Sequence, residues 1–151
     1  MLELLKTFKP CKSGYQLMRI GWKGYLFSIA YPSLLTTKGI WHEANNREDI
    51  ECSYIRYYTE NGKVKREYVR RYYKSGFHVF HTVKAVRHLY KRYKPYITRN
   101  GLISPEDLVI VKVETGGDYT TGLQLGHRVT VCSKRRYLKE IHRIKEPDLF
   151  N

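Results

Sequence analysis

The stretch IECSYIRYYTENGKVKREYVRRYY, residues 50–73, predicts a β-hairpin. Two strand-like runs flank Asn61 and Gly62, which tolerate the positive φ angles that a type I′ turn needs. A two-residue turn fixes the register, so Arg56 faces Glu67 and the pair stabilises the ladder. The other cross-strand pairs expected are Thr59–Val64, Tyr57–Arg66, Ile55–Tyr68 and Tyr54–Val69. We expect the open end to join a sheet and the tip to project into solvent as a two-stranded basic ribbon.

Basic residues are concentrated in and after this hairpin. Between Arg56 and Arg99 the chain has thirteen Lys or Arg and only two acids, Glu60 and Glu67, a net charge of +11 out of +14 for the whole protein. Nine of the fourteen tyrosines lie in or beside the same stretch. Positive charge attracts a polyanion, and aromatic rings offer stacking surfaces for bases. The stretch therefore indicates a class of partner and no particular reaction.

Size and composition favour one folded domain covering residues 1–151. The chain has 42% apolar and 28% charged residues, which is typical of a soluble globular protein. Cys11, Cys52 and Cys132 are far apart and form no CxxC motif, so we expect buried reduced thiols and neither a disulfide framework nor a cysteine zinc site. The apolar runs are too short to span a bilayer, and no signal pattern is visible. We expect a cytoplasmic protein with no membrane partner.

Further strands are predicted on both sides of the hairpin. Residues 14–31 read as two strands joined at Lys23-Gly24, the second buried on both faces. Residues 108–114 (LVIVKVE) and 127–132 are two more strands, connected by a flexible glycine-rich loop over 115–126.

Two helices complete the prediction. Residues 77–94, capped by Ser75 and ended by Pro95, carry one apolar stripe and one basic side. Residues 134–144, capped by Ser133, form the second helix, with an outward basic patch of Lys134, Arg135, Arg136, Lys139 and Arg143. The fold class predicted is α+β: an antiparallel sheet of about six strands with a protruding basic hairpin and two main helices packed on the sheet. We expect Tyr54, Tyr68, Tyr90 and Tyr93 to pack in its core.

Catalytic signatures are absent from the sequence. The 77–94 segment contains His78, His81 and His88 but no acid, unlike a zinc-binding HExxH helix, so no metal and no cofactor are expected. Ser and Cys nucleophile motifs are also missing. A metal-independent ribonuclease is a less favoured alternative that needs only one or two His and a cation. Its catalytic residues would be His127 with Arg128, His81 with Lys84, or His42 beside Glu43. The sequence leaves open whether His81, His88 or His127 has a catalytic role.

Two functional hypotheses of different class fit the basic stretch. The first is a non-enzymatic protein that binds the DNA or RNA backbone with weak sequence preference, because few Asn or Gln are present to read base edges. The hairpin tip and the helix face would form one surface, comprising Arg56, Lys63, Lys65, Arg66, Arg70, Arg71, Lys74, Lys84, Arg87, Lys91 and Arg92, with Tyr57, Tyr58 and Tyr72 as stacking platforms. The second is a small inhibitor or adaptor, for example a virus-encoded one, that docks on an acidic protein surface or a ribonucleoprotein.

Overall fold

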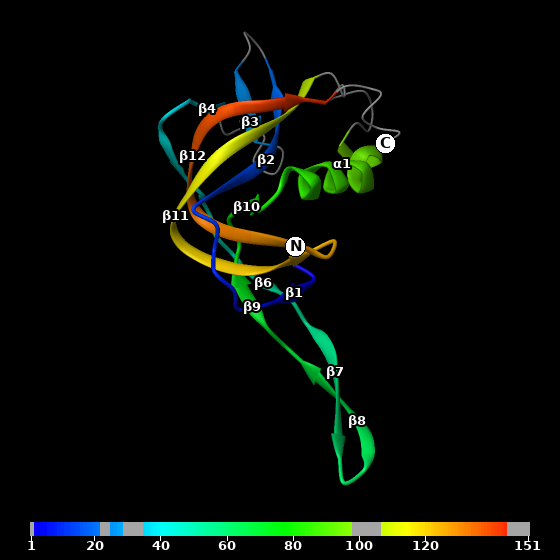
Figure 1. Ribbon diagram of the computed structural model, residues 1–151. Helices are drawn as coiled ribbons and strands as arrows, with labels where there is room; N and C mark the ends of the chain where they lie inside the picture. The colour runs from blue at the N-terminus through cyan, green and yellow to red at the C-terminus, as the bar shows by residue number, and fades with distance from the viewer. Residues whose placement is uncertain (1, 22–24, 29–34, 98–106, 145–151) are drawn as a thin grey trace.

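The computed structural model describes residues 2–21, 25–28, 35–97 and 107–144. The structure is dominated by antiparallel β-sheet, with one helix in the described part of the chain (Figure 1). In chain order the elements are β1 (Leu4–Leu5), β2 (Ser13–Ile20), β3 (Leu26–Ser28), β4 (Leu35–Thr36), β5 (Trp41–Glu43), β6 (Asp49–Glu51), β7 (Tyr54–Glu60), β8 (Lys63–Val69), β9 (Tyr72–Lys74), β10 (Phe77–Phe80), α1 (Val83–Ile97), β11 (Leu108–Gln124) and β12 (His127–Arg143).

A long hairpin of β11 and β12 organises the main sheet. The two strands pair from Gln124–His127, beside the turn at Leu125-Gly126, to the far end of both strands. Strand β2 pairs with the first half of β11, and β10 pairs with the first half of β12. Since β10 also meets β2 at Phe80–Tyr15, the four strands are paired in a closed ring. Strands β1, β3, β4 and β5 add to the margins of this ring.

Apolar side chains are buried on both faces of β11. Leu108 and Ile110 pack in one cluster with residues of α1, while Val109, Val111 and Val113 pack in a second cluster on the opposite face. A strand covered on both faces reads as a continuous apolar run, because neither alternate set of side chains meets water. The strand predicted over 108–114 is therefore confirmed, and it continues further than expected.

The predicted helix over 134–144 and the predicted loop over 115–126 are both wrong. These residues continue the β11–β12 ladder. Register shifts leave Leu138 and Ile141 without partners on β11, so each is an extra residue in a bulge of β12. A bulge changes the spacing between inward-facing side chains from two residues to three. A spacing of three residues is also typical of one face of a helix. In β11 the glycine pair forms a further irregularity, and Gly117 adopts φ +71°.

The basic patch predicted on the 134–144 helix does not form. Arg135 is fully buried, with Nη2 donating to Thr36 Oγ1 at 3.0 Å and its guanidinium 4.5 Å from the centroid of the Phe77 ring. Burial lowers the pKa of Arg135 to about 10, so the side chain stays charged at neutral pH. Three further members of the patch are ion-paired, as Lys134–Glu43, Arg136–Glu114 and Arg143–Glu140.

The helix predicted over 77–94 is shifted. Residues 77–80 form β10, and α1 begins at Val83 after Thr82, whose Oγ1 accepts a hydrogen bond from Ala85 N at 3.2 Å. Ser75, predicted as the cap, instead accepts from Glu48 N. The helix passes through Pro95 to Ile97. Because strands predominate and the described residues contain one helix, the α+β class with two packed helices is corrected to a mainly antiparallel β-structure.

Only part of the predicted strand pair over 14–31 lies in the described residues. Strand β2 forms as expected and pairs with β3, whereas the Lys23-Gly24 turn and residues 29–31 lie outside the described residues. Tyr25, predicted to be buried, is 46% exposed. The Tyr90 side chain is buried as predicted, and the Tyr93 side chain lies outside what the structure describes.

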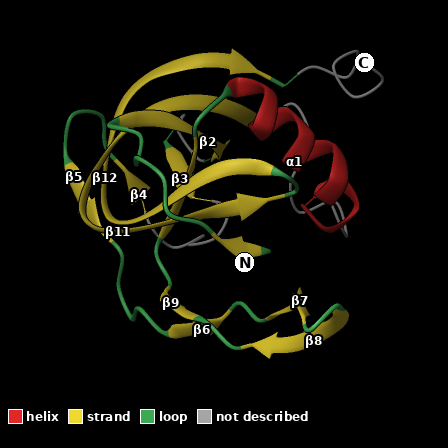
Figure 2. Ribbon diagram, turned by 60° about the horizontal axis from the view of Figure 1, so that its bottom comes forward, coloured by secondary structure: helices red, strands yellow, loops and turns green. Residues whose placement is uncertain are grey.

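Residues 49–74 form one two-stranded ribbon, called the arm below. The β6–β9 and β7–β8 ladders share a single register, and Cys52 N donates to Arg71 O at 2.8 Å between them. At the root of the arm, Cys52 and Tyr73 are buried in the core. Leu2 N donates to the Tyr73 hydroxyl at 2.9 Å, and Cys52 Sγ donates to Leu2 O at 3.0 Å. The root packs on the main sheet without joining it, and the tip extends away from the body (Figures 1 and 2).

The outer part of the arm, residues 54–69, should be dispensable for folding, whereas the root of the arm should not. Residues 55–68 are all exposed, so replacing 54–69 by Asn-Gly between Ser53 and Arg70 should change the free energy of unfolding by less than about 1 kcal/mol. Tyr73→Ala, a buried position, should lower the same quantity by about 3–5 kcal/mol. Urea denaturation followed by circular dichroism measures both variants. Unfolding of the truncated protein would show that the arm belongs to the core.

Candidate nucleic-acid interface

The register of the arm agrees with the sequence prediction. Tyr54 to Glu60 pair with Val69 to Lys63 residue by residue, including Arg56–Glu67. Asn61 and Gly62 have φ angles of 52° and 73°, the positive values that a type I′ turn requires at both central positions. At about 3.3 Å per residue, the strand from Asp49 to Glu60 is about 36 Å long. The arm is therefore an extended ribbon with two accessible faces.

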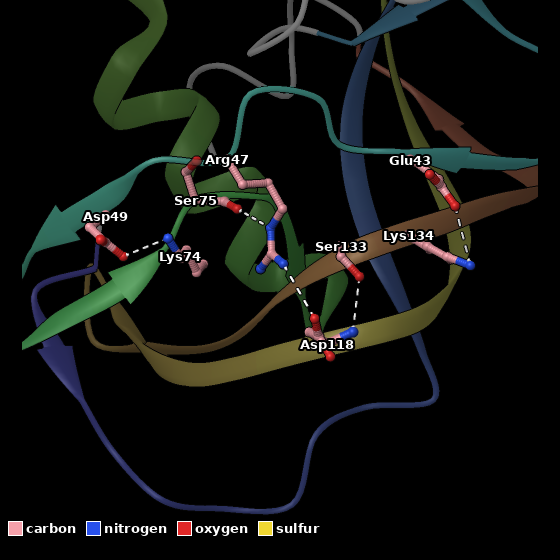
Figure 3. Close-up of polar contacts among 8 residues, drawn as sticks. All are labelled: Glu43, Arg47, Asp49, Lys74, Ser75, Asp118, Ser133 and Lys134. Carbon is pink, nitrogen blue, oxygen red and sulfur yellow. Dashed lines mark hydrogen bonds and ion pairs between the residues drawn. The ribbon is translucent and has the colours of Figure 1, made fainter.

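A polar clamp fixes the root of the arm to the main sheet (Figure 3). Arg47 Nε donates to Ser75 O at 2.7 Å, and Arg47 Nη1 lies 3.7 Å from the Asp118 carboxylate. Asp118 N in turn donates to Ser133 Oγ at 2.9 Å. The segment before β6, the end of β9 and the irregular region of β11 are thereby linked, which sets the direction in which the arm leaves the body.

One face of the arm is electrostatically compensated. This ion-paired face consists of Arg56, Tyr58, Glu60, Lys63, Lys65 and Glu67. Arg56 Nη2 lies 2.5 Å from Glu67 Oε2, and Lys65 Nζ lies 3.2 Å from Glu60 Oε2. Although such exposed pairs add little stability, each places a negative charge beside a cation and reduces its attraction for a phosphate.

The opposite face exposes rings and arginines. This tyrosine face consists of Ile55, Tyr57, Thr59, Val64, Arg66, Tyr68, Arg70 and Tyr72, with Glu51 and Ser53 at its root. Tyr72, Arg70, Tyr68 and Arg66 alternate along one edge, about 6.8 Å apart, since every second residue of a strand faces the same way. Tyr57 is 68% exposed and Tyr68 is 61% exposed, so the prediction that Tyr68 packs in the core is wrong. Tyr54, at the root, is half-buried.

The structure divides the predicted arm cations into two groups. Four are ion-paired. Besides Arg56 and Lys65, these are Arg70, which pairs with Glu51 at 3.1 Å, and Lys74, which pairs with Asp49 at 3.1 Å. The other three, with no carboxylate within ion-pair distance in the described part of the chain, are Lys63, Arg66 and Arg71. Arg71 also lines a cavity of about 450 Å³ at the root of the arm.

The predicted helix cations are remote from the arm. Lys84, Arg87, Lys91 and Arg92 lie on α1, and both ribbon views place this helix away from the tip of the arm (Figures 1 and 2). The hairpin and the helix therefore do not form the single surface expected from the sequence. We treat the arm and the α1 face as separate candidate sites.

The histidines are dispersed, apart from one close pair. His88 Nδ1 lies 2.8 Å from His127 Nε2, a contact between residues 39 positions apart that no sequence motif signals. His81 Nε2 lies 2.9 Å from Thr130 Oγ1, and His42 Nε2 accepts from Thr37 N at 3.0 Å. Over the described ranges, no three His, Cys, Asp or Glu side chains come close enough to hold a metal ion.

The three cysteines are free thiols, as predicted. Cys52 and Cys132 are buried, whereas Cys11 is only partly covered. Burial raises the pKa of Cys132 to about 11, so this thiol is protonated and unreactive at neutral pH.

Comparisons with protein-family models, curated proteins and solved structures gave no match. In the described residues, α1 is neither long nor apolar enough to cross a membrane. The candidate sites therefore rest on geometry and chemistry alone.

Burial of His78 should make the stability of the protein depend on pH. Burial lowers the pKa of His78 to about 4, against about 6.5 in an unfolded chain. Between these values the unfolded state binds the extra proton, so the free energy of unfolding should decrease as the pH falls from 6.5 to 4, by up to about 3 kcal/mol. His78→Phe keeps a ring beside Tyr73 and cannot titrate. Urea denaturation at pH 7 and pH 4.5 should show a smaller loss for this variant, and equal losses would contradict the assignment.

Proposed function

We propose that this protein binds nucleic acid with unpaired bases through the tyrosine face of the arm. The alternation of exposed Tyr and Arg along β8 and β9 is the observation that supports the proposal. Stacking of a base on an aromatic ring contributes about 1–3 kcal/mol and tolerates every base, because each base has a π-face. Arginines between the rings supply positive charge for the phosphates that connect the stacked bases.

The charge of the arm supports a moderate electrostatic contribution. Four arm cations already have acidic partners, and of the other three only Arg66 lies on the tyrosine face, because Lys63 and Arg71 lie on the opposite face. For a single strand, one or two phosphate contacts, from Arg66 and Arg70, correspond to a salt slope of about −1. This slope is shallower than the clustered charge of the sequence suggests. The rings therefore carry a larger share of the affinity than the bulk charge indicates.

Weak sequence preference follows from the composition of the tyrosine face. It presents rings, guanidinium groups, two aliphatic side chains, two hydroxyls and the Glu51 carboxylate that pairs with Arg70, and it contains no Asn or Gln to pair with a base edge. A narrow ribbon fixed only at its root also lets a strand lie along it without a matching groove. We expect binding to depend on strandedness and length more than on sequence.

Docking on a protein surface is the second candidate, and one observation favours it. Ile55 and Val64 are 49% and 75% exposed on the same face as the tyrosines. Aliphatic side chains gain more from burial against a protein than from contact with nucleic acid. Val64→Lys separates the candidates: an added cation should maintain or increase affinity for a nucleic acid, whereas it should abolish binding to an apolar protein site.

Substitution of the tyrosines should weaken binding to single strands. We expect fluorescence anisotropy with a labelled 20-nucleotide oligothymidylate to give a dissociation constant about 5- to 150-fold higher for Tyr57→Ala and for Tyr68→Ala, the equivalent of about 1–3 kcal/mol. A duplex of equal length should bind more weakly than the single strand. Affinity for the single strand should fall roughly fourfold between 50 and 200 mM salt.

Two matched controls accompany this measurement. Tyr57→Phe and Tyr68→Phe keep the ring and should retain the affinity. The double variant Arg56→Gln with Glu67→Gln removes an ion pair from the opposite face without changing the net charge, so it should bind as the unaltered protein does. No detectable binding at 50 mM salt, or equal losses for the Ala and Phe variants, would contradict the proposed stacking function.

A further inference from the structure

A second candidate site lies between α1 and the start of β12. The first turns of α1 and His127 line a cavity of about 720 Å³. Val83, Lys84, Arg87, His88 and Lys91 follow the spacing of one helix face, so their side chains converge on the same opening. His127 directly follows the tight Leu125-Gly126 turn, which places its ring against His88. We call this site the histidine cleft.

Positive charge in the histidine cleft has no local compensation. Lys84, Arg87 and Lys91 all line it, and α1 contains no Asp or Glu. No described carboxylate lies within ion-pair distance of these three cations. Like charges three and four residues apart destabilise a helix by about 0.2–0.5 kcal/mol per pair, and a bound anion would relieve this repulsion. The arm differs, since its cations are largely paired.

The two histidines can exchange a proton with a bound anion. His88 Nδ1 and His127 Nε2 are 2.8 Å apart, and the rings meet edge to face with centroids 5.0 Å apart. One ring donates this hydrogen bond and the other accepts it, which leaves one outer nitrogen able to take up a further proton. Burial, followed by the charges of His88 and Lys84, lowers the pKa of His127, so the neutral form is favoured before an anion arrives.

Other charged residues near the turn do not line the cavity. On β12, the Arg128 guanidinium lies 5.2 Å from the centroid of the Phe8 ring and is not part of the cavity lining. Glu3 approaches the turn, but its Oε1 accepts from Leu125 N at 2.8 Å and the residue does not line the cavity. A metal ion is disfavoured, because three cations surround the pair and two nitrogens 2.8 Å apart leave too little space for a metal between them.

We propose that the histidine cleft binds a phosphate-bearing ligand and that His127, which is hydrogen-bonded to His88, takes up a proton when it binds. Three cations and two imidazoles match the charge and hydrogen-bond acceptors of phosphoryl oxygens. A volume of about 720 Å³ exceeds the size of one phosphate, so the cleft has room for several linked phosphates or for a nucleotide. Free polyphosphates or nucleotides and the nucleic-acid backbone share this chemistry. The proposal does not depend on the function of the arm.

Calorimetric titration of the full-length protein with inorganic tripolyphosphate tests the site. We expect Lys84→Gln with Arg87→Gln to raise the dissociation constant at least tenfold, while Lys38→Gln, an exposed cation outside both sites, changes it less than twofold. Circular dichroism checks that each variant is folded. Equal losses for the cleft variant and Lys38→Gln, or no binding by the unaltered protein, would overturn the proposal.

Proton uptake is measured in two pH 7 buffers whose ionisation enthalpies differ. The unaltered protein should take up a measurable fraction of a proton more per bound tripolyphosphate than His127→Asn does, and exchange by the ligand itself cancels in this difference. If both proteins exchange the same number of protons, the role of the histidine pair is refuted.

A competition experiment with tripolyphosphate distinguishes the two sources of the phosphate. A trithymidylate with hydroxyl ends that displaces tripolyphosphate would identify a nucleic-acid backbone as the ligand, and failure to displace it would identify a free polyphosphate or nucleotide. Both results support a phosphate site. Tyr57→Ala with Tyr68→Ala in the full chain should leave tripolyphosphate binding unchanged, which keeps a failure of the arm proposal distinguishable from a failure of this one.

Discussion

The antiparallel ladder between β11 and β12 is the constraint on which the main sheet depends. Each of these strands is 17 residues long, and the strands β1, β2, β5 and β10 all pair with one of them. Because the β11–β12 hairpin is longer than β2 and β10, each of these strands covers only part of it. The bends of the hairpin bring β2 and β10 together, so that they pair with each other. The bulges and the glycine pair permit this curvature, and α1 then covers an apolar face that the strands create.

Once the arm is folded, its exposed aromatic rings indicate a binding surface more clearly than its positive charge does. In the sequence, the basic residues between Arg56 and Arg99 are more prominent than the tyrosines. The hairpin register places Glu60 and Glu67 beside Lys65 and Arg56, and the root acids pair with two more cations. The same register places the remaining rings together on the other face. The net charge of the stretch therefore predicts the candidate interface less well than does the face of the arm on which each residue lies.

The cations of α1 that line the histidine cleft, unlike most of those on the arm, have no carboxylate partner among the described residues. No acid of α1 accompanies Lys84, Arg87 and Lys91, and a histidine from the start of β12 completes their cleft. Two basic regions that form one block in the sequence thus become two sites of different character: a ribbon with exposed rings and few free charges, and a recess with free charges and a titratable pair.

The sequence by itself determined the arm, because a two-residue Asn61-Gly62 turn and adjacent cross-strand partners are local information. It likewise determined the start of β11, whose apolar run has no other stable environment. Only the tertiary structure decided that residues 134–143 are a strand, since bulges at Leu138 and Ile141 give them helical spacing and the ladder with β11 outweighs that local pattern. Tertiary structure also decided the burial of Arg135 and the meeting of His88 with His127, because both depend on contacts between distant segments.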